Sequence, residues 1–138
     1  DDAGEGARMQ TQKFGCEHCW PAEARAAWDA RAGLRRVRTL IDEPHFIVSL
    51  LTCPRCAQRY VSIFTETIDW TDGEDPQYWT LLPITAAEAD GLIQRAASLD
   101  ETALNALGRE RRSLRRDSPK DKPPRVFWET GIRVGPHD

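Results

Sequence analysis

Two cysteine pairs with the same spacing constrain the fold of this chain more than any other feature of the sequence. Cys16 and Cys19 form one CxxC pair, Cys53 and Cys56 form the other, and the sequence holds no further cysteine. Two cysteines separated by two residues lie on one tight turn, so both sulfur atoms can face the same ion. Two such turns brought together supply four thiolates in a tetrahedron, the ligand set of structural Zn²⁺. We therefore predict one structural Zn²⁺ bound by these four cysteines.

Three other uses of the cysteines remain open at this point. Iron also accepts four sulfur ligands in a tetrahedron, as in rubredoxin-like sites. Cys16 and Cys19 precede a predicted helix, which lowers a thiol pKa, so a redox-active CxxC pair is the second alternative. Two disulfides in a secreted protein are the third. Structural zinc is favoured because two pairs together indicate shared coordination, and four thiolates leave no open position for catalysis.

The second cysteine pair lies between two predicted strands. Residues 45–52 and 58–68 are rich in β-branched and aromatic side chains, so we expect an antiparallel hairpin with Cys53–Cys56 at its tip. The segment CPRCAQRY, Cys53 to Tyr60, resembles the CPxCG knuckle of zinc-ribbon proteins, with Ala57 where that pattern has glycine. The resemblance covers the two turns and the hairpin. It implies a metal site, and by family analogy contact with nucleic acid or with the transcription and translation machinery.

Local patterns predict an α+β fold. We expect an antiparallel zinc-ribbon-like sheet of three or four strands with two or three mostly C-terminal helices. Two capping boxes, Thr85 to Glu88 and Ser98 to Glu101, predict the starts of two of these helices. The expected domain organisation is a disordered N-terminus over residues 1–12, a single domain over 13–117, and a linker with a C-terminal tail over 118–138. The expected strands cover 34–41, 45–52, 58–68, 78–82 and the edge segment 125–130; the expected helices cover 22–32, 85–97 and the region from 99 to 107 or beyond. For residues 34–41 a helix is the alternative, because Leu34, Val37 and Ile41 also have helical spacing.

Composition is typical of an ordinary soluble protein. The 138 residues are 40% hydrophobic and 30% charged, which suits one folded domain. No apolar run approaches the roughly 18 residues that a membrane-spanning helix needs. The acidic, polar start lacks the features of a signal peptide. We therefore expect a cytoplasmic protein without a membrane partner, in a compartment where cysteine pairs stay reduced.

Charge is distributed unevenly, although the net charge is only −3. Residues 42–93 hold nine acidic residues against two arginines, whereas residues 102–125 hold eight basic residues against three acidic ones. If a helix continues past Gly108, Arg112, Arg115 and Arg116 share one face, against which phosphates could align. Together with Arg109, these arginines form a candidate partner-binding surface. The alternative is a solvated helix end, where cations are favoured by the helix dipole.

An acidic loop over residues 69–77 offers a second candidate surface. Trp70 and Trp79 flank it, and aromatic side chains beside polar loops are enriched at binding surfaces, although a small core also uses them. The three histidines accompany no GxSxG pattern, so hydrolase chemistry has no support. The sequence thus predicts a non-enzymatic protein that binds a protein or nucleic acid, with an iron or thiol redox protein as the alternative.

Overall fold

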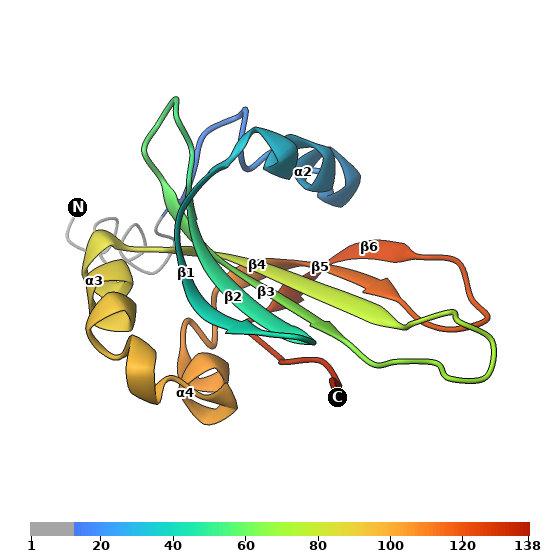
Figure 1. The fold of residues 1–138 in the computed structure, drawn as a ribbon. Helices are drawn as coiled ribbons and strands as arrows, with labels where there is room; N and C mark the ends of the chain where they lie inside the picture. The colour runs from blue at the N-terminus through green and yellow to red at the C-terminus, as the bar shows by residue number, and fades with distance from the viewer. Residues whose placement is uncertain (1–12) are drawn as a thin grey trace, which may run out of the picture.

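The computed structural model describes residues 13–138, and a single antiparallel sheet of six strands dominates this part of the chain (Figure 1). Each strand pairs with the next one in sequence, so the sheet is a meander with β1 and β6 at its edges. The strands are β1 (Arg35–Glu43), β2 (Phe46–Thr52), β3 (Arg59–Glu66), β4 (Gln77–Ile84), β5 (Arg112–Ser118) and β6 (Arg125–Thr130). The predicted hairpin around the second cysteine pair corresponds to β2 and β3.

The helices lie before the sheet and between its fourth and fifth strands. Helix α2 (Ala24–Ala30) and the 3₁₀ turn η1 (Arg31–Gly33) precede β1. Helix α3 (Ala86–Gln94), the 3₁₀ turn η2 (Ala96–Ser98) and helix α4 (Glu101–Ala106) connect β4 to β5. The prediction of three or four strands with mostly C-terminal helices is therefore wrong. The fold is mostly β, and the described part of the chain has two further strands after α4.

The end of α4 explains this error. Leu107 is already extended, and Gly108 has a φ of +56°, a left-handed conformation that glycine adopts readily. The chain then enters β5, where successive side chains point to opposite faces of the sheet. Leu114 is buried and pairs with Leu81 of β4. The predicted helical continuation is thus a strand that completes its hydrogen bonds with β4 and β6.

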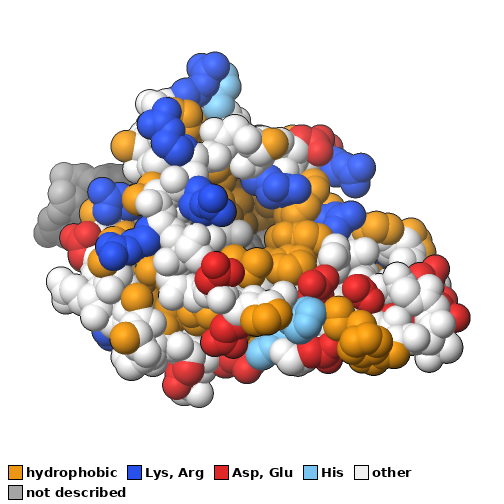
Figure 2. Space-filling view, viewed as in Figure 1, with side chains coloured by type: hydrophobic (Ala, Val, Ile, Leu, Met, Phe, Trp, Pro, Cys, Tyr) orange, Lys and Arg blue, Asp and Glu red, His pale blue; other side chains and the backbone are white. Residues whose placement is uncertain are grey.

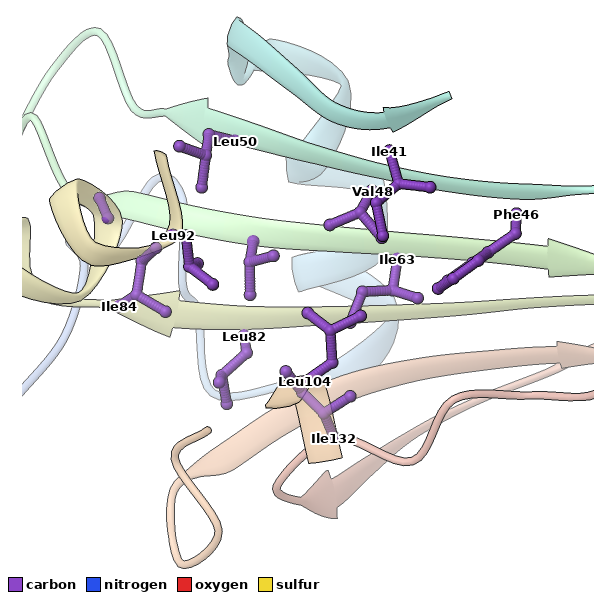
Figure 3. Packing of buried hydrophobic residues seen from close by; sticks show 12 residues of the cluster. Ile41, Phe46, Val48, Leu50, Ile63, Leu82, Ile84, Leu92, Leu104 and Ile132 are labelled. Carbon is purple, nitrogen blue, oxygen red and sulfur yellow. The ribbon is translucent and has the colours of Figure 1, made fainter. Parts of the chain in front are cut away.

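Helices α3 and α4 cover one face of the sheet. The main core lies between these helices and the sheet, and it includes Val48, Val61 and Leu82 from the strands, with Leu92 from α3 and Leu104 from α4 (Figure 3). Because neighbours along a strand face opposite ways, residues such as Tyr60, Leu81 and Leu114 project from the other face. They form a second buried cluster with α2 and the cysteine turns. The sheet therefore has a separate apolar layer on each side.

One of the two predicted capping boxes is present. The Thr85 hydroxyl oxygen accepts the Glu88 amide at 3.1 Å, and a Glu88 carboxylate oxygen accepts the Thr85 amide at 2.8 Å. The prediction of the second box, Ser98 to Glu101, is wrong. Asp100 caps α4 instead, because its side chain accepts the Ala103 amide at 2.9 Å. No helix in residues 13–138 is long and apolar enough to cross a membrane.

Candidate metal centre

The structure brings the four cysteine sulfur atoms together within 4.8 Å of one another. The separations are 3.7 Å for Cys16 and Cys19, 4.0 Å for Cys16 and Cys53, and 3.8 Å for Cys19 and Cys56. Four sulfurs placed about 2.3 Å from one central ion lie about 3.8 Å apart in a tetrahedron. A disulfide would need about 2.05 Å, and all four cysteines are free. The arrangement therefore suits a four-thiolate metal site.

A glycine allows the first cysteine turn to form. The Trp20 amide donates to the Cys16 carbonyl oxygen at 2.8 Å, and the Cys16 amide donates to Cys19 Sγ at 3.3 Å. Gly15 has a φ of +73°, and a Cβ there would lie 2.6 Å from Trp20 Cβ and 2.8 Å from Tyr60 Oη. A side chain at this position would therefore collide with the turn and with the sheet beneath it.

The second cysteine turn caps the hairpin of β2 and β3. The Ala57 amide donates to the Cys53 carbonyl oxygen at 2.8 Å, and the Cys53 amide donates to the Gln58 carbonyl oxygen at 2.9 Å. Ala57 itself adopts a φ of +64°. Alanine thus takes the left-handed conformation that glycine provides in the zinc-ribbon pattern, at a cost of about 1–2 kcal/mol.

Gln58 connects the two turns to the sheet. Its side-chain oxygen accepts the Gly15 amide at 2.9 Å, while its side-chain nitrogen donates to the Ile84 carbonyl oxygen at 2.8 Å. One residue therefore joins the first cysteine turn, the second turn and the end of β4. Sequence reasoning did not single out Gln58, because its partners are far away along the chain.

Tyr60 lies next to the four cysteines and contacts one of them. Its side chain is fully buried, and Tyr60 Oη lies 2.9 Å from Cys19 Sγ. Burial, followed by the neighbouring Cys19, raises the pKa of Tyr60, so the hydroxyl stays protonated and can donate to a thiolate. Trp20 packs on Tyr60 with ring centroids 5.3 Å apart and contacts Trp128 at 5.0 Å. These groups orient the sulfur ligand and exclude water from one side of the centre.

Three of the thiols, those of Cys16, Cys19 and Cys56, differ in pKa when no metal is bound. A hydrogen bond from the backbone of Cys19 helps to lower the pKa of Cys16 to about 7. Burial raises the pKa of Cys56 to about 12 and also raises that of Cys19. Since metal ligands must be thiolates, binding of a cation would release protons from this group of cysteines.

The predicted arginine surface does not form. Arg112 and Arg116 lie on the face of β5 that carries α2, with Arg112 stacked 3.8 Å from the Trp128 ring centroid. Arg115 points to the opposite face, where it is buried, contacts Asp117 at 2.8 Å and donates to the Arg133 carbonyl oxygen at 2.9 Å. Arg109 is exposed in the loop before β5. The prediction that these arginines share one face of a helix is therefore wrong.

The acidic loop is ordered by its own carboxylates and by one lysine. Asp69 accepts amides from within the loop, and Lys120 contacts Asp69 at 3.0 Å and Asp72 at 2.8 Å. The Lys120 ammonium lowers the pKa of Asp69 to about 2. Trp70 is 88% exposed on this loop, whereas Trp79 lies within β4. The two tryptophans therefore belong to different surfaces.

Trp79 belongs to a cluster that sequence reasoning missed. Its ring contacts Phe64 of β3 at 5.0 Å and Trp28 of α2 at 5.6 Å between centroids. Arg116 lies 5.0 Å from the Trp79 centroid, and Arg31 lies 3.7 Å from that of Trp28. We call Trp28, Phe64, Trp79, Arg31 and Arg116 the aromatic–arginine cluster. The sequence did contain a sign of this cluster, since arginines are frequent from Arg31 to Arg38. Phe64 and Trp79, however, which complete the aromatic part of the cluster, come from strands far away along the chain.

Comparisons with known proteins assign no family to this geometry. No family model, no curated protein and no solved structure matches the chain. The zinc-ribbon resemblance therefore rests on the two cysteine turns and the hairpin between β2 and β3.

Proposed function

We propose that this protein is a non-enzymatic zinc protein that binds an anionic macromolecular partner through the sheet face carrying α2. The observation that supports this proposal most directly is the group of four free cysteine sulfurs with separations near those of a sulfur tetrahedron. Four thiolates occupy every position around a tetrahedral Zn²⁺ and leave none for water or substrate. The metal would therefore act as a structural link.

The position of the centre indicates what this link stabilises. Cys16 and Cys19 lie in the segment before α2, whereas Cys53 and Cys56 lie in the turn between β2 and β3. The buried cluster beside the centre also includes Ala27 of α2. A bound ion would hold the N-terminal segment against the sheet, and α2 would thereby stay beside β5 and β6.

The aromatic–arginine cluster supports the assignment of the partner surface. It lies on the sheet face that α2 partly covers, and its aromatic members retain partial exposure. Amphipathic aromatic side chains and arginine are the residue types most enriched where proteins bind partners. The two guanidinium groups favour a partner with negative charge.

Native mass spectrometry before and after treatment with a chelator tests the metal assignment. We expect one Zn²⁺ per chain and a shift toward higher charge states when it is removed, because the N-terminal segment opens. Bound iron would favour the redox alternative. A metal-free chain that retains the compact charge-state distribution would contradict the structural role.

Heparin chromatography tests the partner surface, with heparin as a model polyanion. The double variant Arg31→Gln/Arg116→Gln should elute at clearly lower salt than the unmodified protein, since both charges leave the proposed surface. The matched control is Arg95→Gln/Arg109→Gln, which removes the same charge from exposed positions outside the cluster. Equal shifts for both double variants would show that retention follows net charge alone and would contradict the proposed surface.

A further inference from the structure

We infer that the partner bound by the aromatic–arginine cluster is a single-stranded nucleic acid, with bases against the rings and phosphates against Arg31 and Arg116. This inference rests on the proposed function and narrows its partner to one chemical class. The geometry that supports it is a row of side chains crossing the sheet, beside two arginines, Arg31 and Arg116, that form no ion pair within residues 13–138.

The row follows directly from the strand register. Ile47 of β2 pairs with Phe64 of β3, Phe64 pairs with Trp79 of β4, and Trp79 pairs with Arg116 of β5. Paired residues project to the same face, and neighbouring strands lie about 4.8 Å apart, so the four side chains span about 14 Å. All four are partly exposed. Sheet faces with such aromatic side chains bind single-stranded RNA by stacking two or three bases.

Helix α2 and the turn that follows it complete the surface. Trp28 meets Trp79 edge to face, with an interplanar angle of 69°. Arg116 lies 5.3 Å from the Trp28 centroid and 5.0 Å from that of Trp79, and Arg31 lies 3.7 Å from that of Trp28. Both guanidinium groups are therefore held against aromatic rings, an arrangement that arginine favours and that leaves its outer N–H groups available to phosphate.

Arg31 and Arg116 form no ion pair within the described chain. Burial and the positive charge of Arg116 lower the pKa of Arg31, although the nearby Asp29 opposes this shift. Two like charges that form no ion pair are stabilised when an anion binds beside them.

The surroundings extend the positive charge beyond these two residues. Residues 24–41 include a single acidic residue, Asp29, and five arginines, which are Arg25, Arg31, Arg35, Arg36 and Arg38. Figure 2 shows Lys and Arg side chains gathered over the upper part of this view, around a hollow lined by hydrophobic side chains, with Asp and Glu mostly below. A positive rim around an apolar hollow matches a ligand with charged phosphates outside and flat bases inside.

An acidic protein fits this surface less well. Its carboxylates could pair with the arginines, but the peptide backbone does not itself impose a regular alternation of flat rings and negative charges. Single-stranded nucleic acid has both, and every base presents a ring face for stacking. Double-stranded nucleic acid hides its base faces, so the rings favour a single strand.

Fluorescence anisotropy of a labelled oligonucleotide of about 15 deoxythymidines tests the inference with the zinc-loaded protein. We expect binding at about 50 mM salt and a linear fall of log affinity with log salt. Arg31→Gln/Arg116→Gln should reduce the slope by about 1.4, since each phosphate contact to a single strand contributes about 0.7. The control Arg95→Gln/Arg109→Gln should leave the slope unchanged.

A second variant tests stacking separately from charge. Trp79→Leu keeps an apolar side chain in β4 but removes the ring, so affinity should fall by about 5- to 150-fold while the salt slope stays the same. Circular dichroism and zinc content verify that each variant is folded. A Trp79→Leu protein that is folded and binds the oligonucleotide normally would overturn the stacking geometry.

Two competitors distinguish the partner classes. A duplex of the same length should bind more weakly than the single strand, and equal or tighter duplex binding would overturn the single-strand inference. Polyglutamate represents an acidic protein. If polyglutamate binds and the oligonucleotide does not, with heparin retention still dependent on Arg31 and Arg116, the nucleic-acid inference fails while the proposed function stands. Failure of the unmodified protein to bind heparin, by contrast, would overturn the proposed function itself.

Discussion

Tyr60 determines the environment of one cysteine ligand. Its hydroxyl lies 2.9 Å from Cys19 Sγ in a fully buried position, and nothing else in the described chain accepts a hydrogen bond from it. A donor to a thiolate fixes the orientation of the ligand and offsets part of its negative charge. The aromatic ring also packs against Trp20, so the residue contacts both the cysteine cluster and the apolar layer around it.

We predict that Tyr60→Phe keeps the fold but lowers zinc affinity by about 10- to 100-fold, the usual effect of losing a partner of a metal ligand. Competition with a chromophoric zinc chelator measures this change. Tyr78→Phe is the matched control, because Tyr78 also lies in the sheet but forms no hydrogen bond to a cysteine. Equal affinities for the two variants would contradict a role of Tyr60 Oη in metal binding.

Ala57 holds the second cysteine turn in a conformation that alanine disfavours. Its φ of +64° brings Cβ close to the following carbonyl oxygen, whereas glycine has no such contact. We predict that Ala57→Gly raises the free energy of unfolding by about 1 kcal/mol. Urea denaturation of the zinc-loaded protein measures the difference.

The same substitution in a helix provides the control for Ala57→Gly. Ala87 is exposed in α3, where glycine costs about 0.5–1 kcal/mol because it loses more backbone freedom on folding. Ala87→Gly should therefore destabilise the protein while Ala57→Gly stabilises it. Destabilisation by both variants would show that the left-handed conformation of Ala57 costs less than the added flexibility.

Among the secondary-structure elements, one ion pair joins the start of α3 to the segment before β5. Arg111 contacts Glu88 at 2.8 Å and donates to the Pro83 carbonyl oxygen at 2.9 Å. Glu88 also accepts the amide of Thr85 in the capping box. Burial raises the pKa of Glu88, but hydrogen bonds from Arg111 and Thr85 outweigh burial, so the pKa lies below its ordinary value of 4.5.

We predict that Glu88→Gln lowers the free energy of unfolding by about 1 kcal/mol near neutral pH. A lowered folded-state pKa stabilises the fold fully above pH 4.5, and this stabilisation is lost as the pH falls through the folded-state pKa. The difference between the variant and the unmodified protein should therefore shrink below pH 4.5. Urea denaturation across this pH range measures it.

Glu110→Gln provides the control for the Glu88 experiment. Glu110 is exposed, and none of the ion pairs within residues 13–138 includes it. Its replacement removes the same charge without removing a cap or an ion pair, so stability should change little at any pH. A pH-independent loss of stability in Glu88→Gln would indicate that side-chain shape, rather than charge, holds α3 in place.

At the scale of the whole molecule, the two apolar layers differ in their contact with the candidate metal centre. The main core between the sheet and helices α3 and α4 includes none of the four cysteines. The opposite cluster includes Cys19 and Cys53 as buried members, together with Ala27 of α2. The metal should therefore stabilise the α2 layer much more strongly than the main core.

Hydrogen exchange with mass spectrometry tests this division. After zinc removal, amides in residues 14–33 and 53–58 should lose protection, whereas those of β3 and β4 that flank the main core should retain most of it. The zinc-loaded protein at the same pH is the reference. Uniform loss of protection would mean that the metal holds the entire fold together, and unchanged exchange would mean that α2 packs on the sheet without it.

Short-range patterns in the sequence predicted several parts of this structure. The β-branched and aromatic side chains on either side of Cys53 and Cys56 indicated the hairpin of β2 and β3, and Thr85 with Glu88 indicated the start of α3. The two CxxC pairs indicated that Cys16 and Cys19 would meet the hairpin tip. These features could be predicted because each depends on residues within one turn or strand, or on the strong preference of thiolates for a shared ion.

Only the tertiary structure decided the identity of β5 as a strand and the composition of the aromatic–arginine cluster. Arg112 to Ser118 forms a strand because β4 and β6 supply its hydrogen-bond partners, and no local pattern in this arginine-rich segment reveals that pairing. Likewise, Arg31 and Arg116 meet around Trp28 and Trp79 because α2 packs across the sheet. The sequence by itself determined the metal-ligand set and the local turns. Long-range strand pairing and helix packing decided which side chains share a surface, since the free energy of those contacts depends on residues far apart in the chain.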